Sequence, residues 1–600
     1  MRQPSEHHFT TSDGTRLFYR HWPALSAPDA GAGVPPRRAI VLFHRGHEHS
    51  GRLQHIVDEL ALPGVPMYAW DARGHGRTEG PRGYSPGIGT SVRDVEEFMR
   101  HVAADSGVPA EDTIVIAQSV GAVLAAAWVH DYAPRLRGLI LASPAFKVKL
   151  YVPFARRSLD LFRKFKPLFY INSYVKAKFL THDPERIASF EADPLITRAI
   201  AVNILCELYT TAERLVADAG AITVPTQLLI SGADWVVHHG PQHEFFNNLG
   251  SPIRERHILD GFYHDTLGEK DRARAFEKMR AFIERLYADN APPAADATDA
   301  GLLDADNRGY TANEHHRLRT PLPLLSARRI AYAITRINMS TLGRLGRGIR
   351  LGFETGFDSG STLDYVYRNR PDGITPLGRF ADKTYLNSIG WRGIRQRKVH
   401  AELLIRDALA RLRAENRPLS IVDIAAGHGR YVLDAIRDEP GLTRVLLRDY
   451  SPLNVEQGRR LITERHLEAL ATFEQANAFD RASLAALADA QPPQHRPTLG
   501  IVSGLFELFP DNTLIEAALG GLADAIAPGG YLVYTNQPWH PQLEFIARVL
   551  SSHRDGQPWI MRRRTQQEMD ALVRAAGFEK LDQRIDDWGI FSVSLARRSA

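Results

Sequence analysis

The sequence predicts an α/β fold made of two doubly wound domains. Its 600 residues are too many for a single hydrophobic core. Short apolar runs alternate with stretches of helical length in the first half of the chain, and the same alternation starts again near Ser420. Between the two series lies a segment rich in Ala, Pro and Asp with little periodicity, as expected of a linker.

Five apolar runs in the first half are bounded by turn residues, as buried parallel strands usually are. Helical patterns lie between them, for example at 92–104 and 121–132. From 147 to about 217 the strand pattern stops, and we expect a helical lid rich in aromatic and basic residues, inserted into a domain that spans 1–287. The five expected strands are Arg38–Phe43, Met67–Trp70, Thr113–Ala117, Leu139–Leu141 and Gln227–Ile230.

The rest of the chain is predicted to contain a linker at 288–325, a basic helical extension at 326–394 and a second domain at 395–600. The segment 326–400 has fourteen Arg or Lys against five Asp or Glu, whereas the formal net charge of the whole chain is only +5. The expected strands of the second domain lie in IVDIAAG, RVLLRDY, ATFEQANAF, LGIVSGL and GGYLVYTN. These runs predict a second doubly wound sheet.

The composition is that of an ordinary globular protein, with 44% hydrophobic and 24% charged residues. Cys206 is the single cysteine, which excludes internal disulfides and cysteine-based metal clusters and suits a reducing compartment. The N-terminus has no apolar core of signal-peptide length, and no uncharged apolar run is long enough to cross a membrane. We therefore expect a cytoplasmic protein that binds no metal.

Ser119 lies in TIVIAQSVGAVLAAAWVH, between an expected buried strand and the start of a helix. This is the context of a nucleophile elbow, in which a strained turn lifts a serine hydroxyl above the sheet. The turn crowds its neighbours, and Ala117 and Gly121 are small, although alanine stands where the first glycine is usual. Ser119 is therefore the candidate nucleophile.

A serine nucleophile needs a histidine to take its proton and a carboxylate to orient that histidine. Asp234 follows an expected strand in LLISGADWVV, and His264 follows the next strand in HILDGFYHDTL. Open α/β sheets place their chemistry at such strand ends. Asp260 is an alternative carboxylate, but it precedes His264 by four residues within one loop, so Asp234 is preferred.

Five segments in this order and spacing resemble the monoacylglycerol lipase and lysophospholipase branch of the α/β-hydrolases, over roughly residues 8–287. They are FHRGHEHSGR, YAWDARGHGRTEGPRGY, AQSVG, SGAD and GFYHD. The resemblance implies that Ser119 is the nucleophile, His264 the general base and Asp234 the orienting carboxylate. It also implies a carboxylic ester substrate, either a monoacylglycerol or a lysophospholipid.

The loop after the first of these strands is expected to supply backbone N–H groups for an oxyanion hole. By the same resemblance, the amides of Gly46 and Val120 bind the oxyanion. The family's loop begins His-Gly, whereas this chain has His44-Arg45. The shape of the hole is therefore expected to differ.

The segment LSIVDIAAGHGRYVLDAI passes from a buried strand through a glycine turn into a helix. Gly427 and Gly429 let the backbone approach a ligand that a Cβ would block. Asp423 ends the strand and can bind a cationic amine, and Asp449 ends the next strand, where a carboxylate can bridge two ribose hydroxyls. NAD is the alternative ligand, but the acid precedes this turn, and the G-x-G-x-x-G order of dinucleotide sites is not present here.

Together with ATFEQANAFD and AIAPGGYLVYTN, this loop resembles the class I S-adenosylmethionine-dependent methyltransferases over roughly residues 395–600. The resemblance implies S-adenosyl-L-methionine as cofactor. Alanine replaces the first glycine of the motif, and asparagine stands where aspartate is commoner at the adenine edge. The implied cofactor residues are Asp423, Ala425, Gly427 and Gly429 at the methionine part, Asp449 at the ribose and Asn477 at the adenine.

No motif identifies the methyl acceptor. Methyl transfer mainly needs an aligned nucleophile, so a general base is not obligatory. Tyr450, Glu507, Trp539 and His540 are candidates for lining an acceptor pocket.

The segment Arg328–Arg350 places Ile330, Ile334 and Ile337 one helical turn apart, with arginines between them. One interpretation is an amphipathic stripe that lies on an anionic membrane, at the inner membrane face. The other is a helical pair that covers the substrate site of the second domain, with its arginines solvated. Nucleic acid is not expected as a partner, because no stacking aromatics are interleaved with the arginines.

These features predict a bifunctional enzyme. The first activity is hydrolysis of a small-molecule or lipid ester, and the second is methyl transfer from S-adenosylmethionine to a related product. The alternative is a lipid esterase with a single activity, whose C-terminal domain is a non-catalytic cofactor-binding or docking module.

Overall fold

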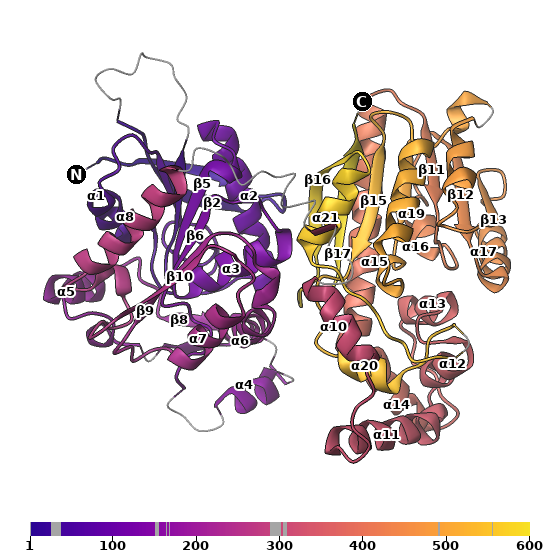
Figure 1. Ribbon diagram of the computed structural model, residues 1–600, viewed down its shortest axis with the longest axis horizontal. Coiled ribbons are helices and arrows are strands. Elements are labelled where there is room, and N and C mark those ends of the chain that lie inside the picture. The colour runs from indigo at the N-terminus through magenta and orange to yellow at the C-terminus, as the bar shows by residue number, and fades with distance from the viewer. Residues whose placement is uncertain are drawn as a thin grey trace. The chain divides into compact units, whose positions relative to one another are not determined.

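The computed structural model divides into two compact units, Met1–Ala295 and Asp296–Ala600, and each is described by itself (Figure 1). No helix among the described residues is both long enough and apolar enough to span a membrane. The described residues are 2–25, 38–150, 155–163, 165–166, 168–173, 175–288, 302–303, 309–489, 492–554 and 556–599.

The first unit contains an eight-stranded sheet in the order β1-β2-β4-β3-β5-β6-β9-β10. Neighbouring strands are parallel from β4 to β10, while β1 and β2 extend one edge in antiparallel pairing. The five predicted strands are confirmed as β3, β4, β5, β6 and β9. The strands are β1 (Ser5–Thr10), β2 (Arg16–Trp22), β3 (Ala39–Phe43), β4 (Met67–Trp70), β5 (Thr113–Gln118), β6 (Gly138–Ala142), β9 (Thr226–Ser231) and β10 (Arg254–Leu259).

Helices cover both faces of this sheet (Figure 1). The central strands β3, β5 and β6 are buried along their whole length, which explains their continuous apolar sequences. Helices α1 and α8 pack on these strands in one hydrophobic cluster. The helices outside the lid are α1 (Gln54–Leu60), α2 (Ile88–Ser106), α3 (Val120–Tyr132), α7 (His239–Asn248) and α8 (Ala273–Ala288).

The predicted lid lies between β6 and β9. It contains helices, as expected, and it also contains a short antiparallel pair of strands, β7 and β8, where the sequence showed no strand pattern. Three-residue strands carry too little periodic signal to be recognised in a helix-rich segment. The elements of the lid are α4 (Ala155–Arg163), β7 (Tyr170–Asn172), α5 (Pro184–Ala192), β8 (Ala199–Ala201) and α6 (Val202–Ala217).

The second unit contains a seven-stranded sheet in the order β13-β12-β11-β14-β15-β17-β16. The pairing is parallel from β13 to β15 and antiparallel at β17 and β16, so the sheet is Rossmann-like with a reversed edge. The five predicted strands are confirmed as β11 to β15. The strands are β11 (Leu419–Asp423), β12 (Leu442–Asp449), β13 (Ala471–Gln475), β14 (Leu499–Val502), β15 (Tyr531–Asn536), β16 (Phe578–Ile585) and β17 (Ser592–Arg598).

Helices flank this sheet, and α15 packs against β11 and β15. The burial of its apolar side chains, with those of α16 and α17, forms one of the two hydrophobic clusters on the sheet. The helices of the sheet domain are α15 (Ile389–Ala414), α16 (Arg430–Ala435), α17 (Pro452–Glu464), α18 (Arg481–Ala485), α19 (Asn512–Ala525), α20 (Leu543–Val549) and α21 (Gln566–Ala575).

The segment before the sheet is helical, as predicted for 326–394, and forms its own cluster with α20. The predicted linker 288–325 needs a correction, because part of it forms helix α10, which packs on α20. Thr311 donates a hydrogen bond of 2.8 Å to Glu568, so α10 belongs to the second unit. Most of the rest of that linker lies outside the described residues. The helices are α10 (Tyr310–Arg319), α11 (Ala327–Ser340), α12 (Arg347–Thr355), α13 (Gly360–Arg368) and α14 (Pro376–Leu386).

Candidate functional site

Ser119 occupies the tight turn between β5 and α3, with φ of 56° and ψ of −115°. A side chain rarely adopts such a backbone conformation, so the surrounding structure must hold the strained turn. A Cβ at Gly121 would come within 2.4 Å of the carbonyl oxygen of His44, which explains why glycine follows the serine by two residues. The turn therefore presents the Ser119 hydroxyl at the carboxyl end of a central strand.

The structure brings Ser119, His264 and Asp234 together in the order required for proton transfer. Ser119 Oγ lies 2.8 Å from His264 Nε2, and His264 Nδ1 lies 2.8 Å from Asp234 Oδ2. Since the imidazole donates from Nδ1 to the carboxylate, Nε2 accepts the hydrogen bond of the serine hydroxyl. All three side chains are buried. This arrangement can activate the serine as a nucleophile.

Asp234 is held as an anion. Burial raises the pKa of this carboxyl, but His264 and the amides of Val236 and Val237 outweigh burial, so its pKa lies below the ordinary value. The two amides donate to Oδ1 at 2.7 and 3.0 Å, which leaves Oδ2 for the histidine. The imidazole Nδ1 bonds to Asp234 and not to Asp260, the alternative carboxylate, whose backbone carbonyl accepts from Arg274.

Gly46 lies beside the first turn of α3, as expected for an oxyanion hole. A Cβ at Gly46 would come within 3.1 Å of Val120 Cγ2, so the two residues are in direct contact. Val120 is the first residue of α3, where the main-chain N–H has no partner inside the helix. The structure thus places Gly46 beside Val120, the residue that follows Ser119.

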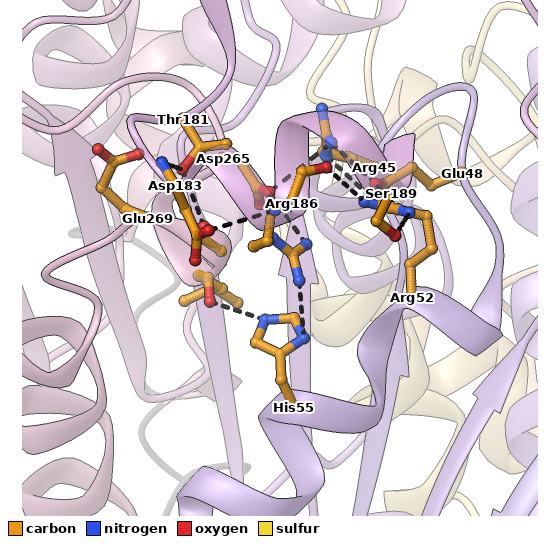
Figure 2. A network of polar contacts seen from close by, with 12 residues as sticks. Arg45, Glu48, Arg52, His55, Thr181, Asp183, Arg186, Ser189, Asp265 and Glu269 are labelled. Carbon is orange, nitrogen blue, oxygen red and sulfur yellow. Dashed lines mark hydrogen bonds and ion pairs between the residues drawn. The ribbon is translucent and has the colours of Figure 1, made fainter. Parts of the chain in front are cut away.

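Arg45, which replaces the family's glycine, does not point into solvent. It is buried, and its guanidinium pairs with Glu48 at 2.8 Å and approaches Asp265 at 3.7 Å. Asp265 directly follows His264 and also pairs with Arg186 of α5 at 3.0 Å (Figure 2). Arg45 therefore belongs to a network of charges that joins the oxyanion loop, the lid and the segment after the histidine.

The network has further links to the elbow and to α1. Gln118, which precedes Ser119, donates to Asp265 at 3.2 Å, and Arg186 contacts His55 of α1 at 3.2 Å (Figure 2). Burial raises the pKa of Asp265, but Arg186 and Arg45 outweigh it, so the pKa lies well below the ordinary value. A depressed carboxyl pKa stabilises the folded state above the unfolded pKa of about 4, and this contribution is lost as the pH falls.

We expect Arg45→Ala to destabilise the oxyanion loop by about 2–3 kcal/mol, because buried Glu48 and Asp265 each lose one cation but keep another. Hydrogen exchange of peptides covering 44–55 and 264–268 measures this loss as faster amide opening. Arg16→Ala is the matched control, since Arg16 forms an exposed pair with Glu79 that contributes less than about 1 kcal/mol. Equal protection in both variants would contradict the role of the network.

The second unit contains a cavity of about 820 Å³ at the carboxyl ends of its parallel strands. Gly427 and Gly429 adopt φ of 58° and 72° in the loop after β11, so both are in the left-handed region that favours glycine. A Cβ at Gly429 would come within 2.5 Å of Leu447 Cδ1. Ala425 also lines the cavity, and the loop has the shape of a ligand cradle.

Asp449 and Asn477 line the same cavity, as predicted for ribose and adenine contacts. Asp449 accepts hydrogen bonds from the amides of Gly427 and Ser451, both at 2.9 Å, and from the Asn454 side chain at 3.0 Å. These bonds fix the carboxylate at the end of β12 beside the glycine loop. Asn477 Oδ1 accepts from the amide of Phe479 at 3.0 Å, and its side chain is exposed.

Asp423 is not placed as predicted. It is fully buried and does not line the cavity; its carboxylate accepts from the Tyr431 hydroxyl and from the Ala425 amide. Burial raises its pKa to about 7. The prediction of a direct contact with a cationic amine therefore needs correction, because the end of β11 turns this side chain toward α16. Asp423 therefore stabilises the glycine loop through its bond to the Ala425 amide, without lining the cavity.

Part of the cavity wall comes from α13, which the sequence did not indicate. A Cβ at Gly427 would lie 3.6 Å from the Cα of Gly360, and Ser361 contacts His428 at 3.3 Å. Asp364 pairs with Arg430, at the start of α16. These residues lie within the predicted helical extension but outside the recognised methyltransferase pattern. Ser359, which caps α13, marks where a helix begins, but no motif indicated that this helix borders the cofactor loop.

Fold and geometry define an α/β-hydrolase unit of the serine hydrolase class, followed by a Rossmann-like unit of the methyltransferase class. The family match agrees: residues 279–598 match the family described as "Putative methyltransferase", and residues 34–271 match that described as "Serine aminopeptidase, S33". The first match covers more than half of the chain, so the chain belongs to that family.

One similar protein spans the whole chain, and others match only the first unit. "Uncharacterized protein YnbC" of Escherichia coli K12 is 59% identical over 601 residues, which cover 100% of this chain and 99% of that protein. A monoacylglycerol lipase of Mycolicibacterium smegmatis is 25% identical over 46% of this chain and 96% of its own length. A crystal structure of Paleococcus ferrophilus monoacylglycerol lipase aligns with 45% of this chain and 98% of its own, at 21% identity and a TM-score of 0.40. The first unit is thus similar in sequence to monoacylglycerol lipases.

Proposed function

We propose that the first unit hydrolyses carboxylic esters with Ser119 as nucleophile. His264 Nε2 takes the hydroxyl proton as Oγ attacks the carbonyl carbon, and then gives that proton to the leaving alcohol. Asp234 orients the imidazole and stabilises its charged form. Water, activated by the same histidine, releases the acid from the acyl-enzyme. The contacts of 2.8 Å on both sides of His264 carry this proposal.

The proposed substrate is a monoacylglycerol or a lysophospholipid. The similarity of the first unit to a monoacylglycerol lipase and to a monoglyceride lipase supports this class. So does the lid, which leaves large apolar side chains exposed where a hydrocarbon chain could bind. The exposed side chains are Leu161, Phe162, Phe165, Leu168 and Tyr170.

A fluorophosphonate probe tests the nucleophile, because it labels only an activated serine. Mass spectrometry of the digested protein is expected to find the label on Ser119, and the labelled protein is expected to release no oleate from 1-monooleoylglycerol. Prior incubation with 1-monooleoylglycerol should slow the labelling. Label on another serine, or full hydrolysis after labelling, would overturn the proposal.

We further propose that the second unit transfers a methyl group from S-adenosyl-L-methionine. Ala425, Gly427 and Gly429 would hold the methionine part, Asp449 the ribose and Asn477 the adenine edge. When bound, the cofactor supplies an electrophilic methyl group on a sulfonium. The glycine loop with its left-handed residues, in contact with a fixed carboxylate on a cavity of 820 Å³, fits this group.

Isothermal titration of the full chain with S-adenosylmethionine tests this proposal. We expect saturable binding with a micromolar Kd and no binding of NAD. Absence of heat with S-adenosylmethionine would favour the alternative, in which the second unit is a docking module without cofactor.

The variant Asp423→Asn tests whether Asp423 only supports the glycine loop or contacts the cofactor directly. Asparagine keeps the size of Asp423. Its Oδ1 can still accept from the Ala425 amide, and its Nδ2 can donate to the Tyr431 oxygen, so we expect the Kd for S-adenosylmethionine to change less than about threefold. Titration calorimetry measures this change. A loss of more than about thirtyfold would show that the carboxylate contacts the cofactor and would contradict its buried placement.

We also propose that the basic helical extension binds an anionic membrane surface, such as the inner face of the cytoplasmic membrane. Ile330, Ile334 and Ile337 of α11 are 50%, 54% and 60% exposed, so this face of the helix packs on little of the second unit. Exposed cations accompany them, among them Arg344 and Lys383. Apolar side chains beside cations suit the boundary between acyl chains and phosphates.

Vesicle sedimentation distinguishes this surface from an ordinary solvated one. The full chain should sediment with vesicles of phosphatidylglycerol and not with those of phosphatidylcholine, and the triple variant Ile330→Ser, Ile334→Ser and Ile337→Ser should lose binding. Ala331→Ser, on an exposed position of the same helix, is the matched control. Equal sedimentation of both variants would overturn the proposal.

A further inference from the structure

A second cavity, of about 490 Å³, lies among the helices of the basic extension, α15 and α20. We call it the apolar cavity. Its walls are mostly aliphatic and aromatic side chains from segments far apart in the sequence. They include Met339, Ile349, Leu363, Phe380, Trp391, Ile394, Phe545, Ile546, Trp559 and Phe591. A cavity of this size and lining suits a ligand with a large hydrocarbon part.

The apolar cavity adjoins the cofactor cavity. Four residues line both of them, and two of the four, Gly504 and Leu508, come from the segment after β14. The other two, Asp358 and Leu363, come from α13 and the turn before it. A ligand in the apolar cavity therefore has one end beside the cofactor cavity, where an acceptor atom must lie for direct methyl transfer.

The polar groups of the apolar cavity are mainly hydrogen-bond donors. Gln537 Nε2 and Arg397 Nε are buried and have no hydrogen-bond partner among the described residues. The amide of Gln542 donates to His540 Nδ1 at 3.0 Å, so the neutral ring carries its hydrogen on Nε2. Burial lowers the pKa of His540 to about 3, which keeps the ring neutral. Gln537 Nε2 and Arg397 Nε have almost no accessible surface, so a ligand oxygen reaches them only after these side chains turn toward the cavity. The cost of leaving buried donors unpaired favours such a ligand.

Glu507 and Asp358 both line the apolar cavity, and both carboxylates are already paired. Asp358 accepts from the Ser552 hydroxyl and from the His553 amide, each at 2.6 Å. Glu507 accepts from Arg397 at 3.3 Å, and both residues are buried. Arg397 lies on α15, and Glu507 lies in the segment after β14. The guanidinium is close to Gly504, which lines both cavities, because a Cβ at Gly504 would come within 2.8 Å of it. An acceptor that needs no proton removed is therefore favoured over an alcohol.

We infer that the apolar cavity is the methyl-acceptor site and that it takes a fatty carboxylate with a single hydrocarbon chain. This inference rests on the proposed methyl transfer. The chain would lie along the aromatic wall and the carboxylate would meet the donors of Gln537, His540 and Arg397. A carboxylate oxygen forms the new bond to the methyl carbon as the carbon–sulfur bond breaks. The electron pair stays on sulfur as a neutral thioether, and the product is a methyl ester with no proton released.

The proposed hydrolysis of a monoacylglycerol or lysophospholipid releases an acid of the same class. The two units would then act in sequence on one acyl group. The first would release it as a carboxylate by hydrolysis, and the second would convert that carboxylate into a methyl ester. The sequence of reactions needs no transfer between sites, since the acid can leave the first unit and bind the second from solution.

Binding can be measured without turnover, because Trp391 and Trp559 line the cavity and bromine quenches tryptophan fluorescence on contact. Titration of the full chain with 9,10-dibromostearate should quench its fluorescence at micromolar ligand. Ala381→Phe and Thr384→Phe each place a ring in the cavity lining and should weaken this quenching at least tenfold. Ala331→Phe, exposed on α11 outside the lining, should leave it unchanged.

Titration with S-adenosylmethionine checks that each variant is folded and keeps the two proposals apart. Neither Ala381 nor Thr384 lines the cofactor cavity, so their variants should bind the cofactor with an unchanged Kd. With tritiated cofactor, oleate should yield methyl oleate, while oleyl alcohol and 1-monooleoylglycerol should yield no product. Suppose that cofactor binding is intact. Equal quenching in all variants, or methylation of another lipid in preference to oleate, would then overturn the proposed acceptor site but not the proposed methyl transfer. Failure of cofactor binding in the unaltered chain would overturn the proposed methyl transfer itself.

Discussion

Ser119→Ala is expected to lower kcat/KM for hydrolysis of 1-monooleoylglycerol by at least about 10³-fold. The variant keeps the fold, because alanine fits a turn already flanked by small residues, but it removes the atom that forms the acyl-enzyme. Residual activity would come from the oxyanion hole and substrate binding alone. Hydrolysis is followed by the release of oleate under conditions in which wild-type turnover is linear.

The same experiment includes further variants of the catalytic residues, which should lose the same activity. His264→Ala should cost about as much as Ser119→Ala, and the double variant should cost no more than either, since the residues act as one unit. Ser91→Ala is the matched control, because Ser91 is also buried but its hydroxyl bonds to Ser85 and to the Gly87 carbonyl, in the turn before α2. Its kcat/KM should stay within about twofold. Additive losses, or a Ser119→Ala variant that keeps a tenth of the activity, would exclude the proposed mechanism.

The second large effect is expected for Asp449→Ala, which should weaken binding of S-adenosylmethionine by about 100-fold. The carboxylate would lose its bonds to a ribose diol, and the amides of Gly427 and Ser451 would lose their acceptor, so the glycine loop would be less ordered. Loss of charge-assisted hydrogen bonds of this kind costs about 2–3 kcal/mol, which corresponds to the expected change in Kd. Isothermal titration gives the Kd directly.

Asp524→Ala is the control for this variant. Asp524 also lies in the second unit, but it is exposed and pairs with Arg481, away from the cavity. Its Kd should equal that of the unaltered chain, and ester hydrolysis should be unchanged in both variants. If Asp449→Ala binds the cofactor normally, the ribose assignment is wrong even where the second unit binds S-adenosylmethionine.

The central sheets could be predicted because a parallel strand buried on both faces needs a continuous apolar run. AIVLF and TIVIAQ are such runs, and both are buried throughout. The antiparallel edge strands were not recognised, because a strand such as β1 is mostly exposed and its sequence, SEHHFT, carries no apolar pattern. Edge strands are specified by pairing with their neighbours more than by their own residues.

The grouping of Ser119, Asp234 and His264 could be predicted because each follows a strand, and parallel strands end at one edge of the sheet. The charge network around Arg45 could not, because Asp265, which Arg45 approaches, and Arg186, which pairs with Asp265, are more than 140 residues away from Arg45. They belong to another loop and to the lid. The direction of the Asp423 side chain could not be predicted either. The spacing of the motif locates the end of the strand, but the side-chain direction depends on the packing of Tyr431.

Helix α13 has a consequence for how the protein can be divided. It precedes the sheet of the second unit in the chain, yet Gly360 closes over the glycine loop and Leu363 forms part of both cavities. A fragment cut immediately before α15 would retain every strand of that sheet and would lack a wall of each chamber. The smallest fragment that keeps both cavities intact is therefore longer than the Rossmann-like sheet and must include α13.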